Sequence, residues 1–346
     1  MRRVCLSLLT AAGLSCLTAP AASAAALIPG PSGPDVSSLL YVPDSLQANG
    51  QAAPLIVAIH GCDQDAADFA AGTAWQTIAE REGAIVLFPQ TDMPGWMRLY
   101  LNATGCWVWW DVDNQRRGSG EPAAIMAMID EVIANQPVDE SRIYATGMSS
   151  GAAMAGTLGV LYPERFAAVA MHSGLPYAAA SVERPPQMTW PLAATLPWTL
   201  DSLAALRGYG RSLDAMVETA LKERPSNAPV LPVMVIHGDS DPLVAPVNAD
   251  RTVGLFAALN DIADDGQDND SIDARADAEQ RHNNDGERPF ELALYVGTSG
   301  RPILAMATVQ GLGHAWSGGQ PSGSYTDAMR PSSSELIWAF FKPFSR

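Results

Sequence analysis

The feature that most constrains this chain is a serine between two glycines, Gly147-Met-Ser149-Ser-Gly151, at the junction of two sequence patterns. Residues 142–146 are β-prone and predict a strand, whereas residues 152–162 are small and apolar and predict a helix that follows at once. Such an abrupt change of direction needs glycine, because glycine has no Cβ to obstruct neighbouring backbones. The pattern therefore predicts a sharp turn that lifts the Ser149 hydroxyl clear of the sheet edge.

A strand, a serine and a helix in this order are typical of the nucleophile elbow of α/β-hydrolases. The motif alone also occurs by chance in a chain with 29 glycines, so the rest of the chain decides its meaning. Strand and helix patterns alternate, which predicts an α/β fold with a mostly parallel central sheet and helices on both faces. The predicted strands are residues 38–43, 54–61, 84–89, 142–146, 166–172, 230–237, 290–296 and 303–310. The predicted helices are residues 66–82, 121–135, 152–162, 249–259 and 332–341.

Two stretches interrupt this alternation. Residues 176–229 lose clear periodicity and are rich in proline and alanine, and we expect an inserted cap or lid over the carboxyl ends of the strands. Residues 261–288 are polar and acidic, and their spacing does not match an EF-hand loop. We expect a solvated surface insertion there rather than a calcium site. Residues 27–346 are expected to form a single catalytic domain, monomeric and without a separate substrate-binding domain.

The first 26 residues have the pattern of a secretory signal peptide. Arg2 and Arg3 precede an apolar run over residues 4–17, and small residues follow at 22–26, where cleavage is expected. The apolar run is too short for a stable membrane anchor, and no later segment is long and apolar enough to span a bilayer. We expect a protein secreted to the periplasm or the medium, with no integral membrane segment.

The composition limits the classes of partner that the protein can bind and indicates its redox environment. The chain has 37 acidic and 21 basic residues and a formal net charge of −16, which disfavours nucleic acid and anionic membranes as partners. Only Cys62 and Cys106 lie outside the predicted signal peptide. Two cysteines in an exported protein predict a single disulfide.

A serine nucleophile needs a histidine base, and a carboxylate must orient that base. In α/β-hydrolases the order along the chain is serine, acid, histidine. Of the five histidines, His314 lies in a glycine-rich loop directly after a predicted strand, and elimination makes it the expected base rather than an ordinary surface histidine. The acid is expected after the strand at 230–237, where Asp239 and Asp241 both qualify. Either can instead serve as a turn former, so the residues alone leave this choice open.

The oxyanion that forms during acyl transfer needs two backbone N–H donors. We expect one from Ser150, directly after the nucleophile, and one from Cys62, in the loop after an early strand. A bridge from Cys62 to Cys106 would hold this loop against a tryptophan-rich segment and place Trp107 at the border of the site.

Together these motifs resemble the type 1 poly(3-hydroxybutyrate) depolymerases and their esterase relatives. The resemblance covers nearly the whole mature chain and rests on His60-Gly-Cys62, Gly105-Cys-Trp107, the elbow at 147–151, and residues 237–244, 311–319 and 323–327. It implies Ser149 as nucleophile and His314 as base. Asp241 holds the family's acid position, so the resemblance prefers it to Asp239. The resemblance also supports the two expected oxyanion donors and the expected disulfide.

The resemblance implies a serine esterase that hydrolyses short-chain polyhydroxyalkanoates through an acyl-enzyme, without a metal or cofactor. We expect Trp107, Trp109 and Trp316 to contact the substrate; the alternative is that they are ordinary packing residues. Members that degrade crystalline polymer carry a linker and a separate binding domain. We see neither in this sequence and therefore expect amorphous polymer or soluble ester oligomers as substrates.

Two other functions use the same motifs. A carbohydrate-ester hydrolase, such as a feruloyl or acetylxylan esterase, shares the fold, and fold does not separate it from a polyester hydrolase. A non-catalytic binding protein on a hydrolase scaffold is expected to lack a member of the serine–acid–histidine set, and candidates for all three are present.

Overall fold

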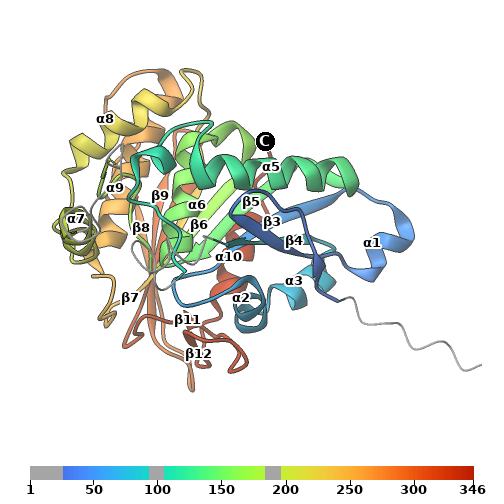
Figure 1. Cartoon of the computed structure of the whole chain (residues 1–346). Coiled ribbons are helices and arrows are strands. Elements are labelled where there is room, and N and C mark those ends of the chain that lie inside the picture. Colours follow the sequence, from blue (N-terminus) through green and yellow to red (C-terminus); the bar gives the residue numbers. More distant parts are fainter. Residues whose placement is uncertain (1–25, 93–104, 184–195) are drawn as a thin grey trace, which may run out of the picture.

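The computed structural model describes residues 26–92, 105–183 and 196–346, so the predicted signal peptide and part of the predicted lid lie outside the described residues. Ten strands form one sheet in the order β1-β2-β4-β3-β5-β6-β7-β10-β9-β8 (Figure 1). These strands are β1 (Ile28–Pro29), β2 (Val36–Tyr41), β3 (Ala53–Ile59), β4 (Ile85–Thr91), β5 (Val138–Met148), β6 (Ala168–His172), β7 (Val233–Gly238), β8 (Ala278–His282), β9 (Phe290–Val296) and β10 (Pro302–Val309). β11 (Trp316–Ser317) and β12 (Thr326–Asp327) pair separately.

The centre of the sheet is parallel. Strands β4, β3, β5, β6, β7 and β10 run in the same direction, with the register fixed by pairs such as Ile56 with Tyr144 and Thr308 with His237. Antiparallel strands complete both edges. The predicted mostly parallel sheet is therefore confirmed, and the carboxyl ends of its central strands share one edge.

Helices cover both faces of the sheet (Figure 1). Alternate residues of β3 point to opposite faces, so Leu55 and Val57 join one apolar core and Ile56 and Ala58 join the other. The first core also receives α5 (Gly120–Asn135), α6 (Ser150–Leu161), α8 (Leu213–Glu223) and α9 (Val247–Asp265). The second core receives α2 (Ala66–Thr73), α3 (Trp75–Glu82) and α10 (Ser333–Phe341).

Helix α6, which follows the serine turn, is buried along its whole length. Its small residues permit this, because a Cβ at Gly156 would lie 2.6 Å from the Met171 side chain and one at Gly159 would lie 3.1 Å from Val169. A helix that is apolar all round belongs in a protein interior. The middle of α6 is thereby packed closely against β6, the strand next to β5.

The structure corrects two predicted elements. The helix expected at residues 66–82 is divided into α2 and α3, because Ala74 between them takes a left-handed φ of 56°. The acidic segment at 261–288 is not wholly irregular, since α9 extends to Asp265 and β8 pairs with β9 at the sheet edge. That segment is otherwise largely exposed, as expected.

The predicted lid consists of unlike parts. Residues 177–180 are buried, and Gln115 Nε2 donates a hydrogen bond to Ala180 O at 2.6 Å. Further along, α8 packs against α9, whereas α7 (Leu196–Leu206) has exposed leucines at 200 and 203. Among the described parts of this stretch, α7 therefore has the character expected of a cap. Short connecting elements are α1 (Asp44–Asn49), η1 (Val112–Gln115) and η2 (Pro163–Arg165). None of the helices in the described ranges is long and apolar enough to cross a membrane.

Candidate active site

Ser149 lies at a strained turn directly after β5. Its φ is 56°, in a region that residues other than glycine rarely adopt, and its N–H donates to His172 O at 2.9 Å. A Cβ at Gly147 would lie 2.5 Å from the Gly151 backbone, and one at Gly151 would lie 2.2 Å from Ile59 O. Glycine is therefore required at both positions, which is the physical reason for the sequence motif.

His314 and Asp241 meet although 73 residues separate them. His314 Nδ1 lies 2.7 Å from Asp241 Oδ2, and both side chains are shielded from solvent. Asp241 follows β7 and His314 follows β10, and these strands are parallel neighbours whose carboxyl ends lie at the same edge. Because a carboxylate only accepts hydrogen bonds, Nδ1 carries a proton, and in the neutral imidazole Nε2 is then the acceptor.

The environment of Asp241 keeps it ionised. Its Oδ1 accepts N–H bonds from Leu243 and Val244, each at 2.9 Å, and His237 Nε2 lies 3.4 Å from Oδ2. Burial alone would raise the pKa of this carboxyl, but hydrogen bonds from His237 and His314 outweigh it and hold that pKa well below its usual range. A negative charge therefore faces the His314 imidazole.

Asp239, the other candidate acid, has a different task. Its Oδ1 accepts the Gly311 N–H at 2.7 Å, and its own N–H donates to Val309 O at 3.1 Å. Asp239 thus ties the start of the glycine-rich loop to the end of β7 and so helps to place His314. Its exposed side chain is bonded to Gly311 and not to the imidazole, so the geometry supports Asp241 as the partner of His314.

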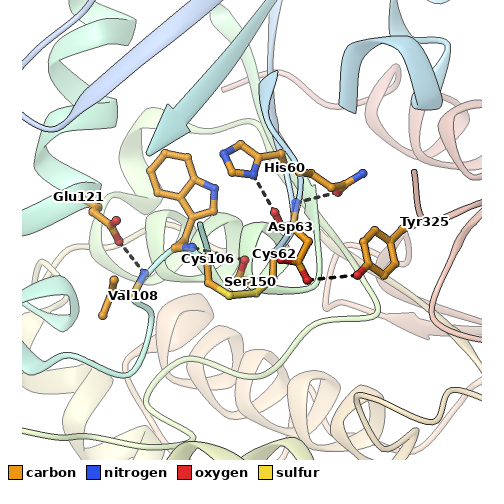
Figure 2. The surroundings of a disulfide bond; sticks show 11 residues. His60, Cys62, Asp63, Cys106, Val108, Glu121, Ser150 and Tyr325 are labelled. Carbon is orange, nitrogen blue, oxygen red and sulfur yellow. Dashed lines mark hydrogen bonds between the residues drawn. A yellow bond between two sulfur atoms is a disulfide. The ribbon is translucent and has the colours of Figure 1, made fainter. Parts of the chain in front are cut away.

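A disulfide connects the loop after β3 with the segment that precedes η1 (Figure 2). Cys62 and Cys106 form this bridge, as the composition predicts. Directly after it, the Trp107 N–H donates to Ser150 Oγ at 3.4 Å, and the Val108 N–H donates to Glu121 Oε2 at 2.8 Å. The bridge therefore links the loop after β3 to the amino end of α6.

Both expected oxyanion donors lie close to the serine. Ser150 is the first residue of α6, where backbone N–H groups have no acceptor within the helix and the helix dipole is positive. Cys62 lines the same cavity as Ser149, and a Cβ on Gly61 would lie 3.3 Å from Ser149 Cβ. Gln64 Oε1 accepts the Gly61 N–H at 3.0 Å and fixes this turn, a role the sequence did not reveal. The two donors remain predictions.

A cavity of about 450 Å³ opens beside Ser149 and His314, within the range of sites for small ligands. Aliphatic side chains from α7 and from the loop after β7 form much of its wall. It is lined by Gly61, Cys62, Asp63, Gln64, Met148, Ser149, Leu203, Leu206, Arg207, Leu243, Val244, His314 and Tyr325. The contributions of α7 and Tyr325 were missed from the sequence, because nothing local indicates which residues of distant segments face one cavity.

The expected tryptophan contacts need correction. Trp107, Trp109 and Trp316 are 0%, 5% and 1% exposed, and none of them lines the cavity. Trp107 packs on His60 with ring centroids 5.4 Å apart, and Trp316 stacks on His172 at 4.9 Å. The segment after Cys106 turns into the core instead of toward the cavity. The structure therefore places these tryptophans in the two apolar cores and not on the cavity wall.

His60 and His172, which pack against Trp107 and Trp316, are neutral. Burial lowers the pKa of His172 to about 3, helped by the nearby His237 and His314. His172 Nε2 shares a hydrogen bond with Ser333 Oγ at 2.9 Å. Burial likewise lowers the pKa of His60. Neither histidine lines the cavity, whereas His314 lines it together with Ser149.

Residues 36–189 match the protein family described as esterase PHB depolymerase. The chain is also 30% identical over 274 residues to poly(3-hydroxyalkanoate) depolymerase C of Paucimonas lemoignei. The alignment covers 79% of this chain and 57% of that protein. This chain is therefore similar to the PHB depolymerase esterases, and it spans little more than half the length of depolymerase C. The family match includes the disulfide and the serine turn, and the alignment with depolymerase C extends over more of the chain.

Acetylxylan esterases are also similar to this chain. It is 29% identical over 237 residues to acetylxylan esterase A of Emericella nidulans, which covers 65% of this chain and 67% of that protein. The solved acetyl xylan esterase from Aspergillus awamori has a TM-score of 0.64 at 20% identity, with 92% of this chain and 99% of that chain covered. This structural likeness concerns the fold alone, which is that of the α/β-hydrolases.

Proposed function

We propose that this protein is a serine esterase that hydrolyses short-chain polyhydroxyalkanoates, such as poly(3-hydroxybutyrate) or its oligomers. The main observation is that His314, oriented by an ionised Asp241, shares one cavity with Ser149 at a strained turn. Similarity to poly(3-hydroxyalkanoate) depolymerase C supports the substrate class. Aliphatic walls suit a chain of short hydroxyalkanoate units.

The proposed reaction is a two-step acyl transfer. Ser149 Oγ attacks the ester carbonyl carbon while its proton moves to His314 Nε2, which can accept it because Nδ1–H faces Asp241. The amides of Cys62 and Ser150 stabilise the oxyanion. The intermediate then expels the alcohol, which takes its proton from the imidazolium. Water, deprotonated by the same imidazole, releases the acid from the acyl-serine.

The proposal also includes the export of the enzyme, its oligomeric state and its cap. Residues 1–26 act as a signal peptide that directs the protein to the periplasm or the medium, and the catalytic domain at 27–346 is a monomer. The disulfide is in keeping with an oxidising compartment. Within the predicted lid at 176–229, α7 supplies the cap through Leu203, Leu206 and Arg207.

The decisive test is clearance of an amorphous poly(3-hydroxybutyrate) suspension, with release of soluble 3-hydroxybutyrate measured alongside. Wild type should clear the suspension and Ser149→Ala should not. Ser299→Ala, a serine on the exposed turn between β9 and β10, is the matched control and should behave as wild type. Clearance that persists in Ser149→Ala would reject the proposed nucleophile.

The second candidate is a carbohydrate-ester hydrolase, which the similarity to acetylxylan esterase A favours. The same three proteins should be assayed on acetylated xylan and methyl ferulate. Rapid turnover of either substrate, lost in Ser149→Ala, with no action on the polyester or its oligomers, would assign the protein to that class and leave the proposed mechanism in place.

A further inference from the structure

The cavity beside Ser149 contains a cation that the acyl-transfer mechanism does not use. Arg207 lines the cavity wall just after the carboxyl end of α7. One guanidinium nitrogen, Nη1, donates to Pro242 O at 3.0 Å. Pro242 directly follows Asp241, so this hydrogen bond ties the guanidinium to the loop that holds the candidate acid.

Arg207 differs from most of the arginines that the structure describes. In the ranges that the structure describes, no carboxylate lies within ion-pair distance of it, although several other arginines have such partners. Those in ion pairs are Arg81, Arg116, Arg117, Arg142, Arg165, Arg275, Arg281, Arg288 and Arg330. A guanidinium has five N–H donors, and Pro242 O engages one of its nitrogens, so a fork remains for an anionic ligand.

The other charged group on the cavity wall is Asp63, which belongs to a different loop. Its Oδ2 accepts a hydrogen bond from Tyr325 Oη at 3.3 Å, and it follows Cys62, the expected oxyanion donor (Figure 2). The two charges thus come from the loop after β3 and from the end of α7. A carboxylate ligand would be attracted to Arg207 and repelled by Asp63, which favours one orientation of the ligand in the cavity.

We propose that Arg207 binds the free carboxylate at the acid end of a hydroxyacid oligomer. This inference rests on the proposed polyester hydrolysis. When an ester bond in such an oligomer breaks, the hydroxyl-end fragment stays on Ser149 and the departing alcohol carries the carboxylate. Arg207 therefore marks the leaving-group side of the cavity. The aliphatic side chains of Leu203, Leu206 and Leu243 contact the uncharged parts of the chain.

The candidate substrates differ in whether they carry a carboxylate close to a cleavable ester. An ester in the interior of a polymer has no nearby charge, and an acetylated sugar or methyl ferulate has no carboxylate either. Only the carboxyl end of an oligomer presents an anion close to a cleavable ester. The prediction is that this enzyme prefers short oligomers with a free acid end and removes units from that end.

The test compares the linear 3-hydroxybutyrate trimer as free acid with its methyl ester, which has the same ester bonds but no charge. The readout is the ratio of the two kcat/KM values. Wild type should favour the free acid about tenfold, the effect of one partly exposed charge-assisted hydrogen bond. Salt should reduce this preference, because the contact is exposed to solvent. Arg207→Gln should bring the ratio close to one, and Arg207→Lys should give an intermediate ratio.

Arg275→Gln is the matched control, since it removes the same charge from an exposed arginine that does not line the cavity. It should keep the wild-type ratio. A wild-type ratio of one, or a ratio unchanged in Arg207→Gln, would overturn the role of Arg207 while polyester hydrolysis stands. Failure of wild type to hydrolyse either trimer, with turnover of 4-nitrophenyl butyrate retained, would overturn the proposed polyester function and this inference with it.

Discussion

The change Asp241→Asn tests the orientation of the imidazole without altering the shape of the site. The two carboxylate oxygens of Asp241 have different partners, which determines how an amide must sit. Oδ1 accepts from the N–H groups of Leu243 and Val244, and Oδ2 faces His314 Nδ1 at 2.7 Å. Turning the amide nitrogen toward the two N–H donors would break both hydrogen bonds, at about 1–3 kcal/mol for each unsatisfied group.

The Asn amide nitrogen therefore occupies the Oδ2 position and donates to His314 Nδ1. This forces the imidazole proton onto Nε2, the nitrogen that must accept the proton of Ser149. The equivalent change in a serine protease triad lowers kcat by about 10⁴. We expect a fall in kcat/KM of about 10³ to 10⁴, or about 4 to 5.5 kcal/mol of transition-state stabilisation.

The assay is hydrolysis of 4-nitrophenyl butyrate, with circular dichroism to verify folding. Asp239→Asn is the matched control, because its amide oxygen can still accept the Gly311 N–H at 2.7 Å, and it should lose less than about tenfold. A larger loss in Asp239→Asn than in Asp241→Asn would refute this reasoning. Retention of near wild-type activity by a folded Asp241→Asn would refute it as well.

Three further predictions concern stability. Gly151→Ala should lower the free energy of unfolding by about 1–3 kcal/mol or more, because the added Cβ would lie 2.2 and 2.3 Å from two backbone oxygens. Gly313→Ala is the control, since its Cβ would have no atom within 4 Å, and it should change this free energy little. Urea titrations measure both. The pKa of His172 is lowered to about 3 in the folded protein, against 6.5 for an exposed histidine. As the pH falls, the unfolded chain therefore binds a proton before the folded protein does. The free energy of unfolding should consequently fall by about 5 kcal/mol from pH 6.5 to 3. His172→Gln should flatten this slope between pH 7 and 5, and equal slopes would contradict the prediction. Replacing Cys62 and Cys106 by alanine opens a loop of sequence separation 44 and should cost about 4 kcal/mol, while an unchanged melting temperature would oppose it.

Much of the fold could be predicted because it depends on local patterns. Apolar runs such as 54–61 and 230–237 predicted buried parallel strands, and the central sheet contains a strand within or close to each run. The alternation of strands and helices predicted helices on both faces, as observed. The break at Ala74 could not be predicted, because alanine is a good helix former and its left-handed conformation is imposed by the surrounding fold.

The candidate site was predictable in kind, and less so in detail. The serine turn is visible in the sequence because backbone sterics demand glycine at 147 and 151. The local residues alone left the choice between Asp239 and Asp241 open, since both lie in one loop, and only the family resemblance preferred Asp241. In the structure, the register of β7 beside β10 brings Asp241 to His314.

Side-chain direction was the weakest part of the sequence interpretation. A tryptophan suits a core as well as a binding surface, and the interpretation of Trp107 as a substrate contact failed because its segment turns inward. Arg207 gave no signal, because an exposed arginine near a helix end is ordinary. Local sequence determined the strands, the helices and the strained serine, since these depend on neighbours along the chain. The tertiary structure alone decided which distant side chains share the cavity, because that depends on how parallel strands align their ends.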